Sequence, residues 1–62
     1  MENNVRYWRE YQGISQRELA RIVGVTSGEI SGIERGVYLP NVVTAILIAR
    51  ALGVPVEKLW EV

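Results

Sequence analysis

The feature that most constrains the fold is a helix-start signal that occurs twice, at Ser15 and again at Thr26. Each of these N-cap residues is followed three residues later by a glutamate, Glu18 or Glu29, which is the pattern of a capping box. A helix is therefore expected to begin directly after each signal. Between the two signals, Gly24 stands where a helix C-terminus favours the left-handed conformation, so the first helix should end there.

Two short helices joined by a tight turn are thus expected, one starting at Gln16 and the other running from Ser27 to about Glu34. Their apolar residues recur at helical spacing, which gives each helix one buried face: Leu19, Ala20, Val23, Ile30 and Ile33. The small Ala20 permits close approach of two crossing helices. This arrangement is a helix-turn-helix.

Three further helices are predicted from caps, glycines and apolar periodicity. The first helix should be capped by Asn3 or Asn4 and run to about Gln12, and the fourth should be capped by Asn41 and stop at Gly53. The last is a short helix through about Trp60, with Pro55 in its first turn. The core face of the fourth helix follows i, i+3, i+4 and i+7 spacing and comprises Ala45, Ile48, Ala49 and Leu52, and Leu59 of the last helix is also expected in the core.

Length and composition exclude several classes of function. A chain of 62 residues with 48% apolar side chains permits one domain with one small core. It has no cysteine and no histidine, which excludes disulfides and thiolate metal sites and removes the commonest base and metal ligand. We therefore expect no enzyme, metal, cofactor or small-molecule ligand. There is no signal-peptide pattern and no apolar run of membrane-spanning length, so a cytoplasmic protein without a membrane partner is expected.

The net charge is zero, with seven Lys plus Arg against seven Asp plus Glu, which is unusual for a nucleic-acid binder. A neutral domain can still turn a basic stripe toward phosphate and hold its acids elsewhere. Glu18 and Glu29 are accounted for by the caps, although Glu29 could also accept a hydrogen bond from cytosine N4.

The match to one known family extends well beyond the two central helices. Its segments are GIS (13–15), QRELA (16–20), GVT (24–26), ISGIERG (30–36), Leu39-Pro40 and IARALGV (48–54). On these residues the chain resembles the repressor-type (Cro/C1, XRE-like) domain of phage repressors, Cro proteins and small bacterial regulators. The resemblance implies an all-α fold, a compact five-helix bundle over residues 1–62 in which helices 2 and 3 form the helix-turn-helix.

The resemblance also implies sequence-specific binding of double-stranded DNA by a small transcriptional repressor, acting as a homodimer on a palindromic operator. The second helix of the motif would enter the major groove while the first crosses the backbone. The expected base-contacting residues are Ser27, Gly28, Ser31 and Gly32. The expected backbone-contacting residues are Gln16, Arg17, Thr26, Arg35 and Tyr38. An ion pair between Arg9 and Glu34 would tie the third helix to the first.

The groove-facing positions of the third helix carry serine and glycine where many members of the family carry longer polar residues. Two interpretations follow. Either the bare surface lets the helix sit deep in the groove, with Ser27 and Ser31 bonding base edges and specificity depending on DNA shape, or direct readout has been lost. In the second case the chain would be a protein-interaction module with the same fold.

Apolar residues outside the predicted core indicate a partner surface. Val43 and Leu47 lie four apart and away from the core face of their helix, and Trp60 lies near the end of the chain. Because the resemblance places a two-fold dimer near the fourth and fifth helices, we expect a homodimer interface built on these three residues. The alternative is that Trp60 folds back over the domain's own core and that dimerisation occurs only on DNA. Tyr7 and Tyr11 either cover neighbouring side chains or contact DNA or a partner.

Overall fold

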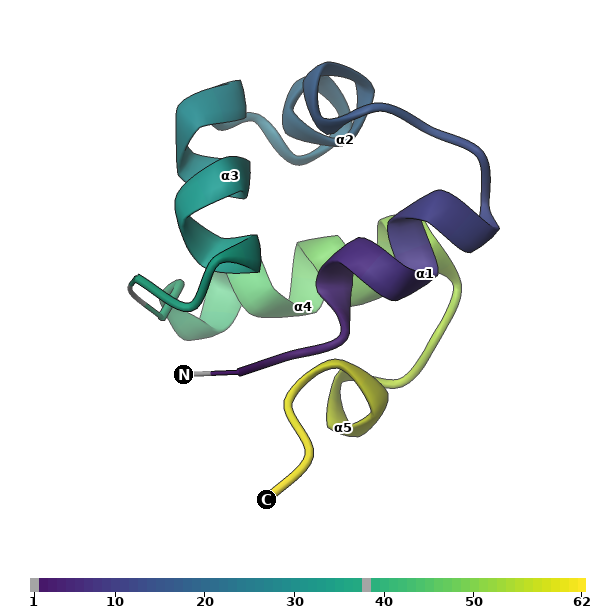
Figure 1. Ribbon diagram of the computed structural model, residues 1–62, viewed down its shortest axis with the longest axis vertical. Coiled ribbons are helices and arrows are strands. Elements are labelled where there is room, and N and C mark those ends of the chain that lie inside the picture. Colours follow the sequence, from purple (N-terminus) through teal and green to yellow (C-terminus); the bar gives the residue numbers. More distant parts are fainter. Residues whose placement is uncertain (1, 38) are drawn as a thin grey trace.

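The computed structural model describes residues 2–37 and 39–62, and over these residues it contains five helices and no strand. The helices are α1 (Val5–Tyr11), α2 (Gln16–Val23), α3 (Ser27–Glu34), α4 (Val42–Leu52) and α5 (Val56–Leu59). Figure 1 shows α4 crossing the middle of the molecule behind α1, with α2 and α3 above it and α5 below. The expected all-α, five-helix architecture is confirmed.

The two glutamate-bearing helix starts differ in detail. Ser15 Oγ accepts from the Glu18 N–H at 3.0 Å and caps α2, but the Glu18 carboxylate accepts from Arg21 at 2.5 Å instead of returning to the cap. At α3 the box is complete, because Thr26 Oγ1 accepts from the Glu29 N–H at 3.0 Å and the Glu29 carboxylate accepts from the Thr26 N–H at 3.4 Å. At α2 the fully charged guanidinium is the stronger partner for the carboxylate.

α4 has the bounds that the sequence predicts. Asn41 Oδ1 accepts from the Thr44 N–H at 2.8 Å and caps its start. Gly53 follows its last residue in the left-handed conformation, with φ of 73°. Gly24 ends α2 in the same way, with φ of 86°, a region that residues with a Cβ rarely adopt.

The outer helices depart from the expected bounds by about one residue. α1 ends at Tyr11, one residue before the expected Gln12, and its first N–H, on Val5, donates to the Asn3 side chain at 3.0 Å. Pro55 is the N-cap of α5 and does not lie in its first turn as predicted. Proline is tolerated at either position because the first amides of a helix have no intrahelical partner.

The core draws on all five helices, and among the described residues it comprises ten buried apolar side chains: Val5, Leu19, Ala20, Val23, Ile30, Ile33, Ile48, Ala49, Leu52 and Leu59. Ala45, expected in this core, is only half-buried because it lies at the edge where α4 and α5 leave a groove open. Over the described residues, no helix combines the length and apolar character needed to cross a membrane.

The N-terminal segment joins α5 to the end of α3. Asn4, at the N-cap position of α1, donates from its backbone N–H to the Leu59 carbonyl at 2.8 Å and from Nδ2 to the Lys58 carbonyl at 2.9 Å. Asn3 Nδ2 donates to the Ile33 carbonyl at 2.7 Å. The two bonds from Asn4 satisfy carbonyls at the C-terminal end of α5, and the bond from Asn3 is a second one to the Ile33 carbonyl, which also accepts from the Gly36 N–H at 3.0 Å.

Candidate nucleic-acid interface

α2 and α3 are fixed relative to each other by a closed turn and by contact between their buried faces. The N–H groups of Gly24 and Val25 both donate to the Ala20 carbonyl, at 2.8 and 3.0 Å. Ala20 is 3% exposed, and its small side chain lets the two helices approach closely. Figure 1 views α2 nearly along its axis and α3 from the side, so the two helices cross. This is the helix-turn-helix that the capping signals predict.

A buried polar network anchors the C-terminal end of α3 to α1 and α2. Arg9 Nε and Nη2 donate to the two carboxylate oxygens of Glu34 at 2.6 and 3.3 Å, and Gln16 Nε2 donates to Glu34 Oε1 at 3.0 Å. Arg9 Nη1 donates to the Ile14 carbonyl at 2.8 Å. The hydrogen bond from Glu34, together with its charge, raises the pKa of Arg9 above its ordinary value, although burial acts in the opposite direction. The expected Arg9–Glu34 pair is therefore present.

The first turn of α3 presents an exposed and sparsely covered surface. Ser27 and Gly28 are exposed. Thr26 is also exposed, but its hydroxyl forms the cap, and the Glu29 carboxylate lies 3.4 Å from both Thr26 N and Thr26 Oγ1. The capping role of Glu29 is thus confirmed. The hydroxyl of Ser27 and the bare backbone of Gly28 are the groups left for a ligand to contact here.

The second turn of α3 corrects one expectation. Gly32, predicted to contact bases, is buried. At the end of the helix, Gly36 adopts φ of 74° and the Val37 N–H donates to the Gly32 carbonyl at 2.9 Å, which closes the C-terminal end of α3. Ser31 is half-buried, and its hydroxyl accepts from Arg35 Nε at 3.3 Å.

The residues expected at the DNA backbone lie at both ends of α3. Gln16 is half-buried and bonded to Glu34, which brings the start of α2 beside the end of α3. Arg17 and Arg35 are exposed, and within the described part of the chain the Arg17 guanidinium has no hydrogen-bond or ion-pair partner. Thr26 stands at the opposite end of α3 as its N-cap. Tyr38 lies outside the described residues.

Two further ion pairs of the described residues are local. Arg21 and Glu18 are paired at 2.5 Å, and Arg6 and Glu10 at 3.2 Å, in both cases along one exposed helix face. The hydrogen bond from Arg21, with its charge, lowers the pKa of Glu18 below its ordinary value. Across residues 2–37 and 39–62, no group of three or more His, Cys, Asp or Glu side chains is placed to hold a metal ion.

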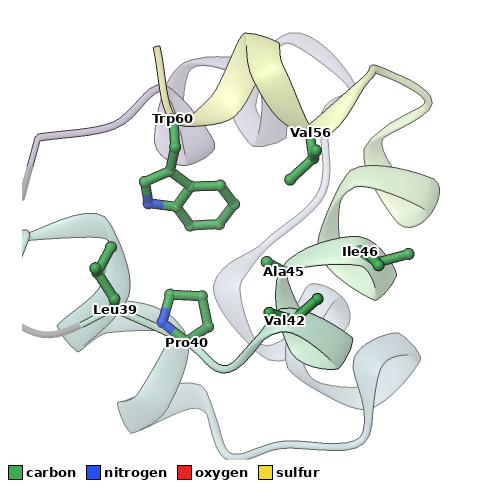
Figure 2. Close-up of a pocket in the computed structure, with 7 residues that line it drawn as sticks. All are labelled: Leu39, Pro40, Val42, Ala45, Ile46, Val56 and Trp60. Carbon is green, nitrogen blue, oxygen red and sulfur yellow. The ribbon is translucent and has the colours of Figure 1, made fainter. Parts of the chain in front are cut away.

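An apolar groove of about 360 Å³ lies between α4, α5 and the segment before α4. In Figure 2 the Trp60 ring projects from the end of α5 into the middle of this groove, and Pro40 lies beneath it. Trp60 packs against the core, as the alternative interpretation held, and its indole N–H is buried without a hydrogen-bond partner among the described residues. The lining residues are Leu39, Pro40, Val42, Ala45, Ile46, Val56 and Trp60.

The three residues expected at a dimer interface lie on two adjoining faces and not on one. Val43 and Leu47, 66% and 37% exposed, follow the side of α4 that points away from the core, whereas Trp60 lies in the groove. Successive residues of a helix are about 100° apart, which separates Val43 from the groove-lining Val42. Ile46 lies between the two faces. The i, i+4 spacing of Val42 and Ile46 was the sequence signal for the groove, which we did not anticipate.

The two exposed tyrosines of α1 flank a tryptophan. Tyr7 and Tyr11 meet the Trp8 ring edge-on, with ring centroids 5.2 and 5.5 Å apart. Trp8 is half-buried against the core. The geometry supports the interpretation that these tyrosines cover a neighbouring side chain.

Comparison with known proteins places this geometry in a family. A family model described as helix-turn-helix matches residues 5–59. An uncharacterized HTH-type transcriptional regulator of Methanocaldococcus jannaschii is 35% identical over 97% of this chain and 91% of that protein. The control protein C.SmaI of Serratia marcescens is 36% identical over 95% of this chain and 70% of that protein. The crystal structure of the restriction-modification controller protein C.AhdI from Aeromonas hydrophila matches with a TM-score of 0.81 and 30% identity, over 87% of this chain and 82% of that one.

Proposed function

The chain belongs to the helix-turn-helix family, in its XRE, Cro/C1-type class of DNA-binding transcriptional regulators, and we propose that it binds double-stranded DNA sequence-specifically as a homodimer on a palindromic operator. The observation that carries this proposal is α3, whose N-terminal turn is exposed while its C-terminal end is anchored through Glu34. A helix held in this way can enter a groove without changing its angle to α2. The protein would act in the cytoplasm as a repressor, by occupying its operator.

In the proposed complex, α3 lies in the major groove and α2 crosses the phosphate backbone. α3 has eight residues and is therefore about 12 Å long, which is close to the width of the groove. Arg17, Arg35 and the Gln16 amide would contact phosphates beside the C-terminal end of α3. The cap residue Thr26 would contact the backbone at the other end, where the helix dipole favours negative charge.

Base readout would use few groups. Ser27 and Ser31 carry hydroxyls that can donate and accept, and Gly28 contributes only backbone. Few direct hydrogen bonds limit discrimination between base pairs, so DNA shape and deformability would supply the rest of the specificity.

Selection of bound duplexes from a random-sequence library tests the DNA-binding proposal. Fluorescence anisotropy then measures the affinity of the protein for the selected duplex and for a scrambled duplex. Arg17→Ala and Arg35→Ala should weaken both duplexes by similar factors, whereas Ser27→Ala should change the preference between them. Arg50→Ala is the matched control, because it removes an exposed arginine of α4 and should weaken binding least. No binding by the wild-type chain at about 50 mM salt would favour a protein-interaction module.

The salt dependence of binding gives a second check. Three of the cationic side chains, those of Arg6, Arg9 and Arg21, are held in ion pairs. Few full charges therefore remain for phosphate, and we expect the affinity to fall with salt at a logarithmic slope of about 2 to 5 per monomer. Arg17→Ala should reduce that slope by about 1.

The proposed dimer pairs the two apolar faces of α4 with each other. The ridge formed by Val43, Ile46 and Leu47 of one copy would lie on the groove of the other, and the two-fold axis would repeat that contact. Ile46 belongs to both faces, so it would lie near the axis. The exposed apolar surface supports this assignment, because a monomer gains nothing from keeping it in water. The two α3 helices would then contact half-sites about 34 Å apart.

Light scattering over a dilution series tests self-association. We expect a dimer that Leu47→Glu dissociates, because the charge would have to be buried in the apolar contact. Tyr11→Glu is the control, since it places the same charge on an exposed residue of α1. A chain that is monomeric at high micromolar concentration, or a Leu47→Glu variant that still dimerises, would contradict this interface.

A further inference from the structure

Gly28 is a glycine that the fold does not require. It lies in the first turn of α3 with an ordinary helical backbone, because it is not among the glycines with positive φ. Apart from the adjacent residues and the backbone of its own helix, a Cβ built there would meet one heavy atom of the described residues within 4 Å, Thr26 Oγ1 at 3.8 Å, which is an ordinary van der Waals contact. Alanine would therefore fit without strain, and it forms helix more readily than glycine does.

The other glycines of the helix-turn-helix have structural explanations that Gly28 lacks. Gly24 and Gly36 adopt φ of 86° and 74°, which strongly favours glycine. Gly32 is buried. Gly28 alone is both exposed and helical. No contact within the described part of the molecule offsets the loss of helix stability that glycine causes there.

We propose that Gly28 is a specificity-determining residue, whose missing side chain leaves room for a thymine 5-methyl group in the major groove. This inference rests on the proposed DNA-binding function. Its neighbours support it, because the Ser27 hydroxyl is exposed and the Glu29 carboxylate is held back at the Thr26 cap. A thymine methyl is the one apolar group on the major-groove edge of a base pair, and it takes up space that a Cβ at this position would otherwise occupy.

The test compares stability with binding in Gly28→Ala. The variant should melt at or above the wild-type temperature, by up to about 4 °C, because alanine favours the helix and the first turn realises only part of the difference found in a helix interior. It should nevertheless bind the selected duplex about tenfold more weakly, within the range expected for one mismatched base pair. Unfolding cannot account for weaker binding by a protein that is at least as stable as the wild type. Tyr11→Ala, on exposed α1 surface, should leave the affinity unchanged.

Deoxyuridine, which lacks the 5-methyl group, identifies the contact. Each thymine of the selected duplex is replaced in turn by deoxyuridine. At one position in each half-site, this replacement should restore the affinity of Gly28→Ala to the wild-type level. Equal or tighter binding of the unmodified duplex by Gly28→Ala, or failure of every deoxyuridine to restore binding, would overturn the inference while leaving DNA binding intact. Absence of duplex binding by the wild-type chain would instead refute the proposed function, and the inference with it.

Discussion

Glu34→Ala should remove most of the stability of this protein. The Glu34 side chain is 3% exposed and accepts bonds from Arg9 and Gln16, while the Arg9 side chain is 10% exposed. Without the carboxylate, the guanidinium stays buried with the Ile14 carbonyl as its remaining partner. Breaking a buried pair in this way costs about 3 to 5 kcal/mol. A domain of 62 residues is stable by about 3 to 9 kcal/mol, so at the middle of both ranges the variant would keep about a third of the wild-type stability.

Urea unfolding followed by far-ultraviolet circular dichroism measures this loss, and three further variants isolate its cause. Glu34→Gln keeps the shape of the side chain and one hydrogen-bond acceptor, so it should lose less stability than Glu34→Ala. The double variant Arg9→Met with Glu34→Leu removes both charges and should recover much of the stability, because the penalty comes from the stranded charge and not from the missing bond. Glu10→Ala breaks an exposed ion pair and should change little.

The reasoning fails if Glu34→Ala unfolds at the wild-type urea concentration. It also fails if the double variant is no more stable than Glu34→Ala, since the loss would then come from packing at Glu34 and not from the uncompensated charge of Arg9.

Two further predictions concern single helix starts. Because Arg21 lowers the pKa of Glu18 below its ordinary value of 4.5, the pair stabilises the fold above that pH and is lost as the pH falls through the lower, folded-state value. Glu18→Gln should therefore flatten the decline of stability below about pH 5 in urea titrations at low salt, and an unchanged pH profile would contradict this. Asn41→Ala removes the acceptor for the Thr44 N–H and should lower the free energy of unfolding by about 1 kcal/mol, measured by the same urea titration. An unchanged unfolding midpoint would show that this cap contributes nothing to stability.

The helices could be predicted because their ends are encoded locally. Ser15, Thr26 and Asn41 each cap a helix with a side chain that bonds an amide three residues away, and Gly24 and Gly53 end helices by their own conformation. None of these signals depends on how the helices pack. For this reason α3 and α4 begin and end where the sequence indicates. At α2 the capping box is incomplete, because the Glu18 carboxylate bonds Arg21 of the same helix and not the Ser15 N–H.

The candidate site was less predictable because its surface depends on contacts between distant residues. Gly32 is buried in the folded protein, whereas helical periodicity alone places it on an open face together with Gly28. The i, i+4 spacing of Val42 and Ile46 indicates one wall of the groove, but the groove also requires Trp60 on the opposite wall, and that placement depends on how α5 packs. The Arg9–Glu34 pair spans 25 residues, and it was expected from the family resemblance and not from spacing.

The zero net charge does not oppose DNA binding, because most of the acids near the helix-turn-helix are held in local contacts. Glu34 neutralises Arg9 inside the protein, Glu18 pairs with Arg21, and the Glu29 carboxylate is held at the N-terminus of α3, where the helix dipole partly offsets its charge. Arg17 remains exposed and unpaired among the described residues beside this surface. The net charge of zero therefore includes acidic side chains whose electric field is largely neutralised by a neighbouring group. A DNA phosphate near this surface would interact mainly with Arg17, whose charge is not neutralised in this way.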